Sequence, residues 1–311
     1  MRVKRFIPAK TRKLVGELGR RVQRLHWRPL ELSVNATAVR FQKSLRANGY
    51  GVLPIYKNGP TNILYLVKSS DIDLWAENLV HTVSTLTGHK ISIVAILDKA
   101  PSAEDLARVL GISSNICIKL ESEYEQQIIA LNPEISKYNA ARQSWIKQQV
   151  LKTFYVGTAT NPTLILDSDT YIMKNIRFQT STTQLLLCGA DFHSPYSKHL
   201  KKFLGIVPTA TSFVHHCQLQ YPELVREIYG QDLISGLKKW LRLGIKFAEY
   251  SAVSEFQTYG DYILTKYPER VKLLFHTHHE VSRKEVTGSI REYLLHHRKE
   301  CDCDLLTFIN K

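Results

Sequence analysis

Residues 163–170 read Thr-Leu-Ile-Leu-Asp-Ser-Asp-Thr, an apolar and partly β-branched run that ends abruptly in two aspartates. A run of this length and composition is typical of a buried strand. In open α/β sheets, ligands bind at the carboxyl ends of the strands, which is where Asp167 and Asp169 stand. Carboxylate oxygens suit Mg²⁺ and Mn²⁺, which are usually held together with substrate phosphates. The stretch therefore predicts a metal and diphosphate site.

Strand and helix patterns alternate on both sides of this stretch. Apolar runs predict further strands at residues 63–67, 91–97, 115–120, 184–187 and 271–275. Helical patterns cover residues 74–86, 140–154, 211–229, 231–243 and 255–266, and Ser102 has the chemistry of a helix cap before another helix. This alternation predicts an α/β fold with a mainly parallel sheet sandwiched by helices.

The composition is that of a globular protein. The chain has 311 residues, of which 44% are hydrophobic and 23% charged, enough for one large domain or two small ones. No apolar run approaches the roughly 20 residues that span a bilayer, and no secretory signal pattern opens the chain. Five scattered cysteines fit a reduced, cytoplasmic protein, and the closely spaced Cys301 and Cys303 are interpreted as structural or incidental.

The net charge of +14 favours anionic partners such as phosphorylated substrates, anionic membrane or nucleic acid. Residues 1–28 hold ten Lys or Arg residues and a single acid, Glu17. Their apolar residues follow helical spacing, so the segment predicts a basic amphipathic helix that lies on an anionic membrane surface. Two alternatives stay open, namely a helix packed on the domain with a solvated face, and a transit peptide.

Asp167 and Asp169 are one residue apart. In an extended backbone their side chains point to the same side, with Ser168 opposite, so both can reach one cation. The alternative is that they cap the turn after the strand, as aspartates often do.

Residues 142–152 form a helical segment just before these aspartates. Arg142, Gln148, Gln149 and Lys152 are its candidates for substrate contacts, because amides both donate to and accept from sugar hydroxyls. The alternative is an amphipathic helix whose polar face is solvated.

Ser254 and Glu255 begin the predicted helix 255–266. An ionised carboxylate in the first helical turn is favoured by the helix dipole, which makes Glu255 a candidate general base. The alternative is a capping serine followed by an acid that merely matches the dipole.

Several histidines follow strands or lie on helical patterns. His276 and His278 share one face of an extended chain after the strand 271–275, and either is a candidate metal ligand. Arg283 and Lys284 follow as candidate phosphate contacts. His215, His216, His296 and His297 are interpreted as structural or surface residues, because they fall on helical patterns.

Three elements in this order resemble the GT-A glycosyltransferases. The elements are Gln148-Gln149-Val150-Leu151-Lys152, Asp167-Ser168-Asp169 and Ser254-Glu255-Phe256-Gln257-Thr258-Tyr259-Gly260. They are most similar to a bacterial glycosyltransferase-like family in which Gln-Gln-x-x-Lys precedes Asp-(Ser/Ala)-Asp and Ser-Glu-(Phe/Tyr)-x-x-Tyr-Gly follows. The resemblance covers roughly residues 60–285.

The resemblance implies a GT-A-like, Rossmann-type fold and a nucleotide-sugar donor whose diphosphate is bridged by Mn²⁺ or Mg²⁺ to Asp167 and Asp169. It implies that Glu255 deprotonates the acceptor hydroxyl or orients one of the sugars, and that His276 or His278 completes the metal site. Donor contacts are then expected from Lys68, Asp71, Arg142, Gln148, Gln149, Lys152 and Ser168, and acceptor contacts from Asp191, His193 and Tyr259. It leaves inverting or retaining chemistry undecided.

We therefore expect a basic segment at 1–58, a catalytic domain at 59–285 and a C-terminal tail at 286–311. The catalytic domain divides into a nucleotide-binding half, 59–170, and an acceptor-binding half, 171–285. The expected activity is metal-dependent transfer of a sugar to a bacterial surface-glycan acceptor, such as a lipopolysaccharide or capsule intermediate. The protein is expected to be cytoplasmic, at the inner face of the membrane, with no nucleic-acid partner.

Two rival functions remain. One is a metal-dependent nucleotidyl or phosphoryl transferase, or a nuclease, that uses the same aspartates. The sequence has no P-loop motif and no second cluster of carboxylates for a two-metal site, which counts against it. The other is a nonenzymatic protein that binds through its basic amino terminus, although no zinc-finger or RNP-type motif is present.

Overall fold

The computed structural model describes residues 62–85, 92–173, 178–179, 183–189, 193–209, 211–245, 252–275, 278–283, 286, 290–297 and 305–309. The basic segment 1–58 and its predicted amphipathic helix lie outside these residues. Within the described ranges, none of the helices combines the length and the apolar composition needed to cross a bilayer.

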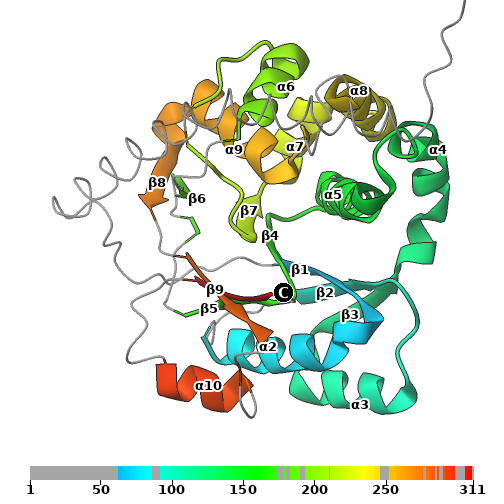
Figure 1. Cartoon of the computed structure of the whole chain (residues 1–311), viewed down its shortest axis with the longest axis vertical. Helices are drawn as coiled ribbons and strands as arrows, with labels where there is room; N and C mark the ends of the chain where they lie inside the picture. The colour runs from blue at the N-terminus through cyan, green and yellow to red at the C-terminus, as the bar shows by residue number, and fades with distance from the viewer. Residues whose placement is uncertain are drawn as a thin grey trace, which may run out of the picture.

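A five-stranded sheet forms the centre of the molecule, with the strand order β3-β2-β1-β4-β7 (Figure 1). β1, β2, β3 and β4 are parallel, and β7 runs antiparallel to β4. The strands are β1 (Asn62–Val67), β2 (Ser92–Leu97), β3 (Ile116–Leu120), β4 (Thr163–Leu166) and β7 (Cys217–Gln220). This is the predicted α/β architecture with a mainly parallel sheet.

Helices cover both faces of the sheet (Figure 1). One face packs against α2 (Ile72–Thr85) and α3 (Ala103–Ile112), and the apolar residues between them form one core. The other face packs against the helices α4 (Glu125–Ile135), α5 (Ala140–Thr158), α7 (Pro222–Tyr229), α8 (Leu233–Ile245) and α9 (Glu255–Lys266), which share a second core. Alternation in β1 explains this division, because Ile63 and Tyr65 belong to the first core and Leu64 to the second.

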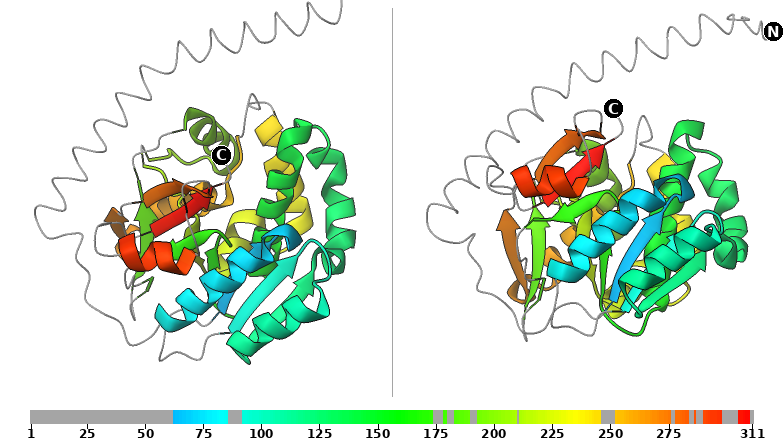
Figure 2. Two further views of the ribbon diagram at one scale, coloured as in Figure 1. Left: turned by 60° about the horizontal axis from the view of Figure 1, so that its bottom comes forward. Right: turned by 90° about the horizontal axis from the view of Figure 1, so that it is seen from below.

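Two smaller sheets complete the described structure. β6 (Gln184–Cys188) pairs in parallel with β8 (Val271–Phe275). In the other sheet β10 (Leu305–Ile309) lies between β5 (Thr170–Ile172) and β9 (His278–Ser282), and α10 (Ile290–His297) lies beside it (Figure 2). The remaining elements are α6 (Ser194–Leu204) and the short 3₁₀ turns η1 (Ser69–Asp71), η2 (Glu121–Tyr124) and η3 (Pro268–Arg270).

Most elements predicted from periodicity are confirmed, but the helix predicted over 211–229 is wrong. Residues 217–220 form β7, and a helix begins only at Pro222, where a proline suits the first helical turn. Gln218 and Gln220 are buried in the strand, where the Gln218 amide donates to the carbonyl of Phe256 and the Gln220 amide to Gln218 Oε1. Buried glutamines hide the apolar signal of a strand, which is why the pattern pointed to a helix.

Candidate functional site

Asp167 and Asp169 follow β4, next to the point where the order of the strands in the sheet reverses. Chain order runs outward from β1 through β2 to β3, whereas β4 lies on the opposite side of β1. The carboxyl ends of β1 and β4 therefore flank a topological switch point, which is the usual ligand crevice of open α/β sheets.

The backbone after β4 turns instead of staying extended. The N–H of Thr170 donates to the carbonyl of Asp167 at 3.0 Å, and the side-chain amide of Asn78 on α2 donates to the carbonyls of Ser168 and Thr170. The expectation of an extended Asp-x-Asp segment is therefore wrong, since a tight turn separates the strands β4 and β5. The turn still keeps Asp167 and Asp169 close enough for one charge to raise the pKa of the other.

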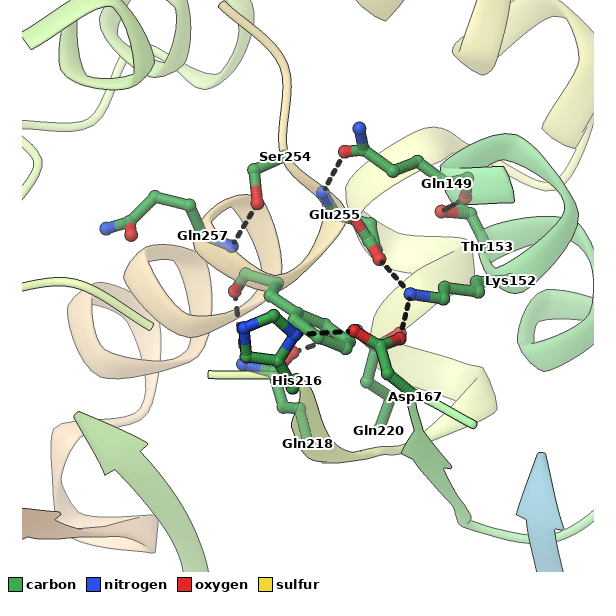
Figure 3. A network of polar contacts seen from close by, with 11 residues as sticks. Gln149, Lys152, Thr153, Asp167, His216, Gln218, Gln220, Ser254, Glu255 and Gln257 are labelled. Carbon is green, nitrogen blue, oxygen red and sulfur yellow. Dashed lines mark hydrogen bonds and ion pairs between the residues drawn. The ribbon is translucent and has the colours of Figure 1, made fainter. Parts of the chain in front are cut away.

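Asp167 is held at both carboxylate oxygens (Figure 3). Oδ1 accepts from the Lys152 ammonium at 2.7 Å, and Oδ2 lies 2.9 Å from Nδ1 of His216. Burial alone would raise the pKa of Asp167, but the Lys152 charge and the His216 contact outweigh it and lower that pKa. Asp167 is therefore a fixed anion.

Lys152 also contacts Glu255, so α5 and α9 meet at this point (Figure 3). Its Nζ lies 3.3 Å from Oε1 of Glu255, and both side chains are more than nine-tenths buried. The N–H of Glu255 donates to the side-chain oxygen of Gln149 at 3.1 Å. Burial raises the pKa of Glu255, although Lys152 partly offsets the shift.

Glu255 is the first residue of α9, as the capping pattern predicts. The hydroxyl of Ser254 accepts from the N–H of Gln257 and closes the first turn. Gln257 in turn accepts from the N–H of Phe213 and donates to the carbonyl of Thr211, so α9 also holds the loop that leads to His216.

The carboxylate of Asp169 has weaker hydrogen-bonding and ionic partners than the carboxylate of Asp167. Its carboxylate receives a long contact of 3.5 Å from the Thr170 hydroxyl. Burial and the neighbouring charge of Asp167 raise the pKa of Asp169 to about 6, and the nearby side chains of His216 and Arg283 partly offset this rise. A half-buried carboxylate whose pKa is raised in this way gains from a bound cation.

The loop after β1 faces the same switch point. Asp71 receives a contact of 3.3 Å from Arg283, which follows β9, and the N–H of Ser69 donates to Asp98 after β2. Lys68 is exposed. The loop predicted for the donor therefore lies at the same edge of the sheet as the end of β4, and Arg283 is near enough to Asp169 for its charge to lower the pKa of that carboxyl.

The other predicted donor residues are spread along α5. Gln149 and Lys152 belong to the cluster, and Gln148 is half-buried beside them. Arg142 is exposed, and its guanidinium lies over the ring of Trp145 at 5.8 Å. Ten residues separate Arg142 from Lys152, about 15 Å along the helix, so the structure does not bring Arg142 into the cluster.

The predicted acceptor residues are less closely grouped. Tyr259 is 2% exposed, and its hydroxyl accepts from the N–H of Tyr221 and donates to Gln184, as a framework residue does. His193 precedes α6, and its ring meets the ring of Tyr196 edge to face. His278 is the first residue of β9, whereas Asp191 and His276 lie outside the described residues.

His216 is the site residue that sequence reasoning missed. The sequence pattern predicts a helix at this position, but His216 immediately precedes β7 and has a positive φ of 58°. Its own carbonyl accepts from the N–H of Asp167 at 2.9 Å while its ring contacts the Asp167 side chain. Only the antiparallel pairing of β7 with β4 creates this contact, so no local signal could have identified it.

The arrangement suits a hard divalent cation. The carboxylates of Asp167, Asp169 and Glu255 face one lysine and one histidine, and Asp169 is the under-compensated member. Within the described ranges no three His, Cys, Asp or Glu side chains form a complete metal site by themselves. That composition fits a cation held by one or two carboxylates and completed by substrate phosphates.

No protein-family model matches the sequence, and no curated protein sequence matches it either. Solved glycosyltransferase structures do resemble the fold. The mannosyltransferase Ktr4p from S. cerevisiae has a TM-score of 0.51 at 9% identity, covering 79% of this chain and 80% of that one. Core-mannan synthase A from Aspergillus fumigatus, in a Mn/GDP form, has a TM-score of 0.49 at 10% identity, over 72% and 75% of the two chains.

The galactosyltransferase LgtC, in complex with donor and acceptor sugar analogues, has a TM-score of 0.41 at 12% identity, over 80% of this chain and 87% of that one. At such identities the likeness shows the fold alone, and the neighbours are glycosyltransferases. The chain therefore has the GT-A type of α/β fold.

Proposed function

We propose that this protein is a metal-dependent glycosyltransferase that uses a nucleotide-sugar donor. The observation that carries the proposal is the under-compensated carboxylate of Asp169, beside Asp167, at the switch point of a GT-A-type sheet. The overall likeness to the mannosyltransferase Ktr4p supports the same reaction class.

In this proposal Asp167 and Asp169 would together hold Mn²⁺ or Mg²⁺. The cation, when bound, neutralises the charge that develops on the departing nucleoside diphosphate. Lys68 and Asp71 lie beside the nucleoside, and His276 or His278 is a further candidate ligand. Glu255 acts on the reacting sugars, either as the base for the acceptor hydroxyl or as the carboxylate that orients them.

The acceptor that we propose is a bacterial surface glycan or its lipid-linked precursor. The basic segment 1–28 supports this choice, because ten cationic residues favour an anionic membrane surface at which such precursors are held. The proposed location is therefore the cytoplasmic side of a membrane, with peripheral attachment.

The test is thermal stabilisation by a panel of nucleoside diphosphates and sugar nucleotides, with and without Mn²⁺. Ligand that binds the native state raises the melting temperature by mass action. We expect a shift with one nucleotide that requires Mn²⁺ and that Asp169→Asn abolishes. Asp261→Asn is the matched control, because burial likewise raises the pKa of Asp261 to about 6, but Asp261 lies on α9 against Thr209.

Each outcome decides between functions. A Mn²⁺-dependent shift that Asp261→Asn keeps and Asp169→Asn loses supports the donor site. No shift with any nucleotide, from folded protein, would overturn the proposal and favour binding through the basic segment. Nucleic-acid cleavage that depends on Asp169, without sugar-nucleotide hydrolysis, would instead favour the nuclease.

A further inference from the structure

Lys152 lies at the centre of the site, but its side chain is too buried to contact a substrate directly. Its side chain is 9% exposed, and its Nζ lies 2.7 Å from Asp167 and 3.3 Å from Glu255 (Figure 3). The centre of the Phe256 ring lies 4.9 Å from the ammonium. A side chain this buried acts on a substrate through its two partners.

A buried ammonium is costly unless it is paired, and here two carboxylates pair it. Lys152 therefore stays a cation. Its single positive charge is shared between Asp167 and Glu255. When the charge of one of these carboxylates is neutralised, the ammonium can pair more fully with the other.

We infer that Lys152 is a positioning residue that couples the two halves of the site, an inference that rests on the proposed function. Lys152 competes with the divalent cation for Asp167, so it holds the empty site together and weakens cation binding. When the cation binds, the ammonium pairs more fully with Glu255 and fixes the carboxylate toward the reacting sugars. Lys152 thus lowers the affinity of the site for the cation and, at the same time, holds Glu255 in the correct position.

The inference predicts opposite changes in two quantities. Lys152→Met removes the charge with little change in volume, so Mn²⁺ alone should bind about tenfold more tightly, since a nearby like charge has gone. The same variant should turn over sugar nucleotide at least about tenfold more slowly, because Glu255 is no longer held. A merely structural role would weaken cation binding and turnover together.

The experiment titrates the full-length protein with Mn²⁺ in mildly alkaline buffer and follows the free Mn²⁺ signal by electron paramagnetic resonance. Steady-state hydrolysis of the sugar nucleotide gives kcat in parallel. Lys147→Met is the matched control, because Lys147 lies on the same helix, is half-exposed and pairs with Glu121. We expect the control to match the wild type, and Lys152→Arg to recover the wild-type affinity for Mn²⁺.

Should Lys152→Met not fold, Lys152→Gln removes the charge while keeping a donor for Asp167, and the same tightening is expected. Unchanged or weaker Mn²⁺ binding in the folded neutral variant would overturn the inference while leaving the proposed function intact. Absence of Mn²⁺ and nucleotide binding in the wild type would overturn both.

Discussion

The backbone N–H of Phe308 donates a hydrogen bond to the carbonyl of Asp169 at 3.0 Å. A residue near the C-terminus therefore helps to fix the turn that carries the candidate metal ligands. Through β10 this contact ties the β5-β10-β9 sheet to the end of β4, so residues 305–309 contribute to the framework of the site.

Deletion of residues 305–311 should lower the free energy of unfolding by at least about 3 kcal/mol, because it exposes the buried partners of Leu305, Leu306 and Phe308. Denaturant unfolding measures the loss, and any Mn²⁺-dependent nucleotide binding should disappear with it. Deletion of residues 310–311 alone serves as the control. An unchanged unfolding midpoint in the longer deletion would contradict the role assigned to β10.

Gly260→Ala should destabilise the protein by about 1–3 kcal/mol. A methyl group at Gly260 would lie 2.3 Å from Cγ of Phe213. Phe213 belongs to the loop that precedes His216 and that α9 holds in place. Gly111→Ala is the matched helical control, since open space surrounds that position, and it should stabilise the protein by about 0.5–1 kcal/mol. Thermal melts of both variants suffice, and a stabilised Gly260→Ala would refute the close packing.

The buried carboxyl of Asp261 should make the free energy of unfolding depend on pH. Burial raises its pKa to about 6 in the folded protein, from about 3.8 when unfolded, so between these values the native state binds the proton more tightly. Wild-type stability relative to Asp261→Asn should therefore fall as pH rises from about 4 to about 6, by up to about 3 kcal/mol, and then level off. Urea unfolding across this range gives the difference, and a flat difference would contradict the shift.

Tyr259→Phe separates a framework role from the predicted acceptor role. The hydroxyl of Tyr259 links Tyr221 to Gln184 inside the protein, so its loss should cost about 1–3 kcal/mol of stability. The KM for the acceptor should stay unchanged in the folded variant. A raised KM with unaltered stability would show instead that Tyr259 contacts the acceptor.

Local signals were enough for the elements whose chemistry is local. The apolar run before Asp167 and the capping pattern of Ser254 and Glu255 predicted β4 and the start of α9, because burial period and cap chemistry act within a few residues. The spacing of Gln149 and Lys152 indicated their helix, although not that they would meet Glu255.

Contacts between distant segments could not be predicted in the same way. His216 and Phe308 reach the Asp167–Asp169 turn only through strand pairings that are set by packing of the whole domain. Charged and amide side chains that are buried in such pairings look like surface residues in a sequence, because only their partners make burial tolerable.

The reversed direction of β7 has a consequence for how the chain tolerates change. A parallel strand would bring its carboxyl end to Asp167, but β7 brings its beginning, so the site draws on residues that precede the strand. A change of loop length therefore affects the site differently at the two ends of β7. An insertion next to Tyr221 would lengthen a remote connection, whereas one next to His216 would move a side chain that holds Asp167.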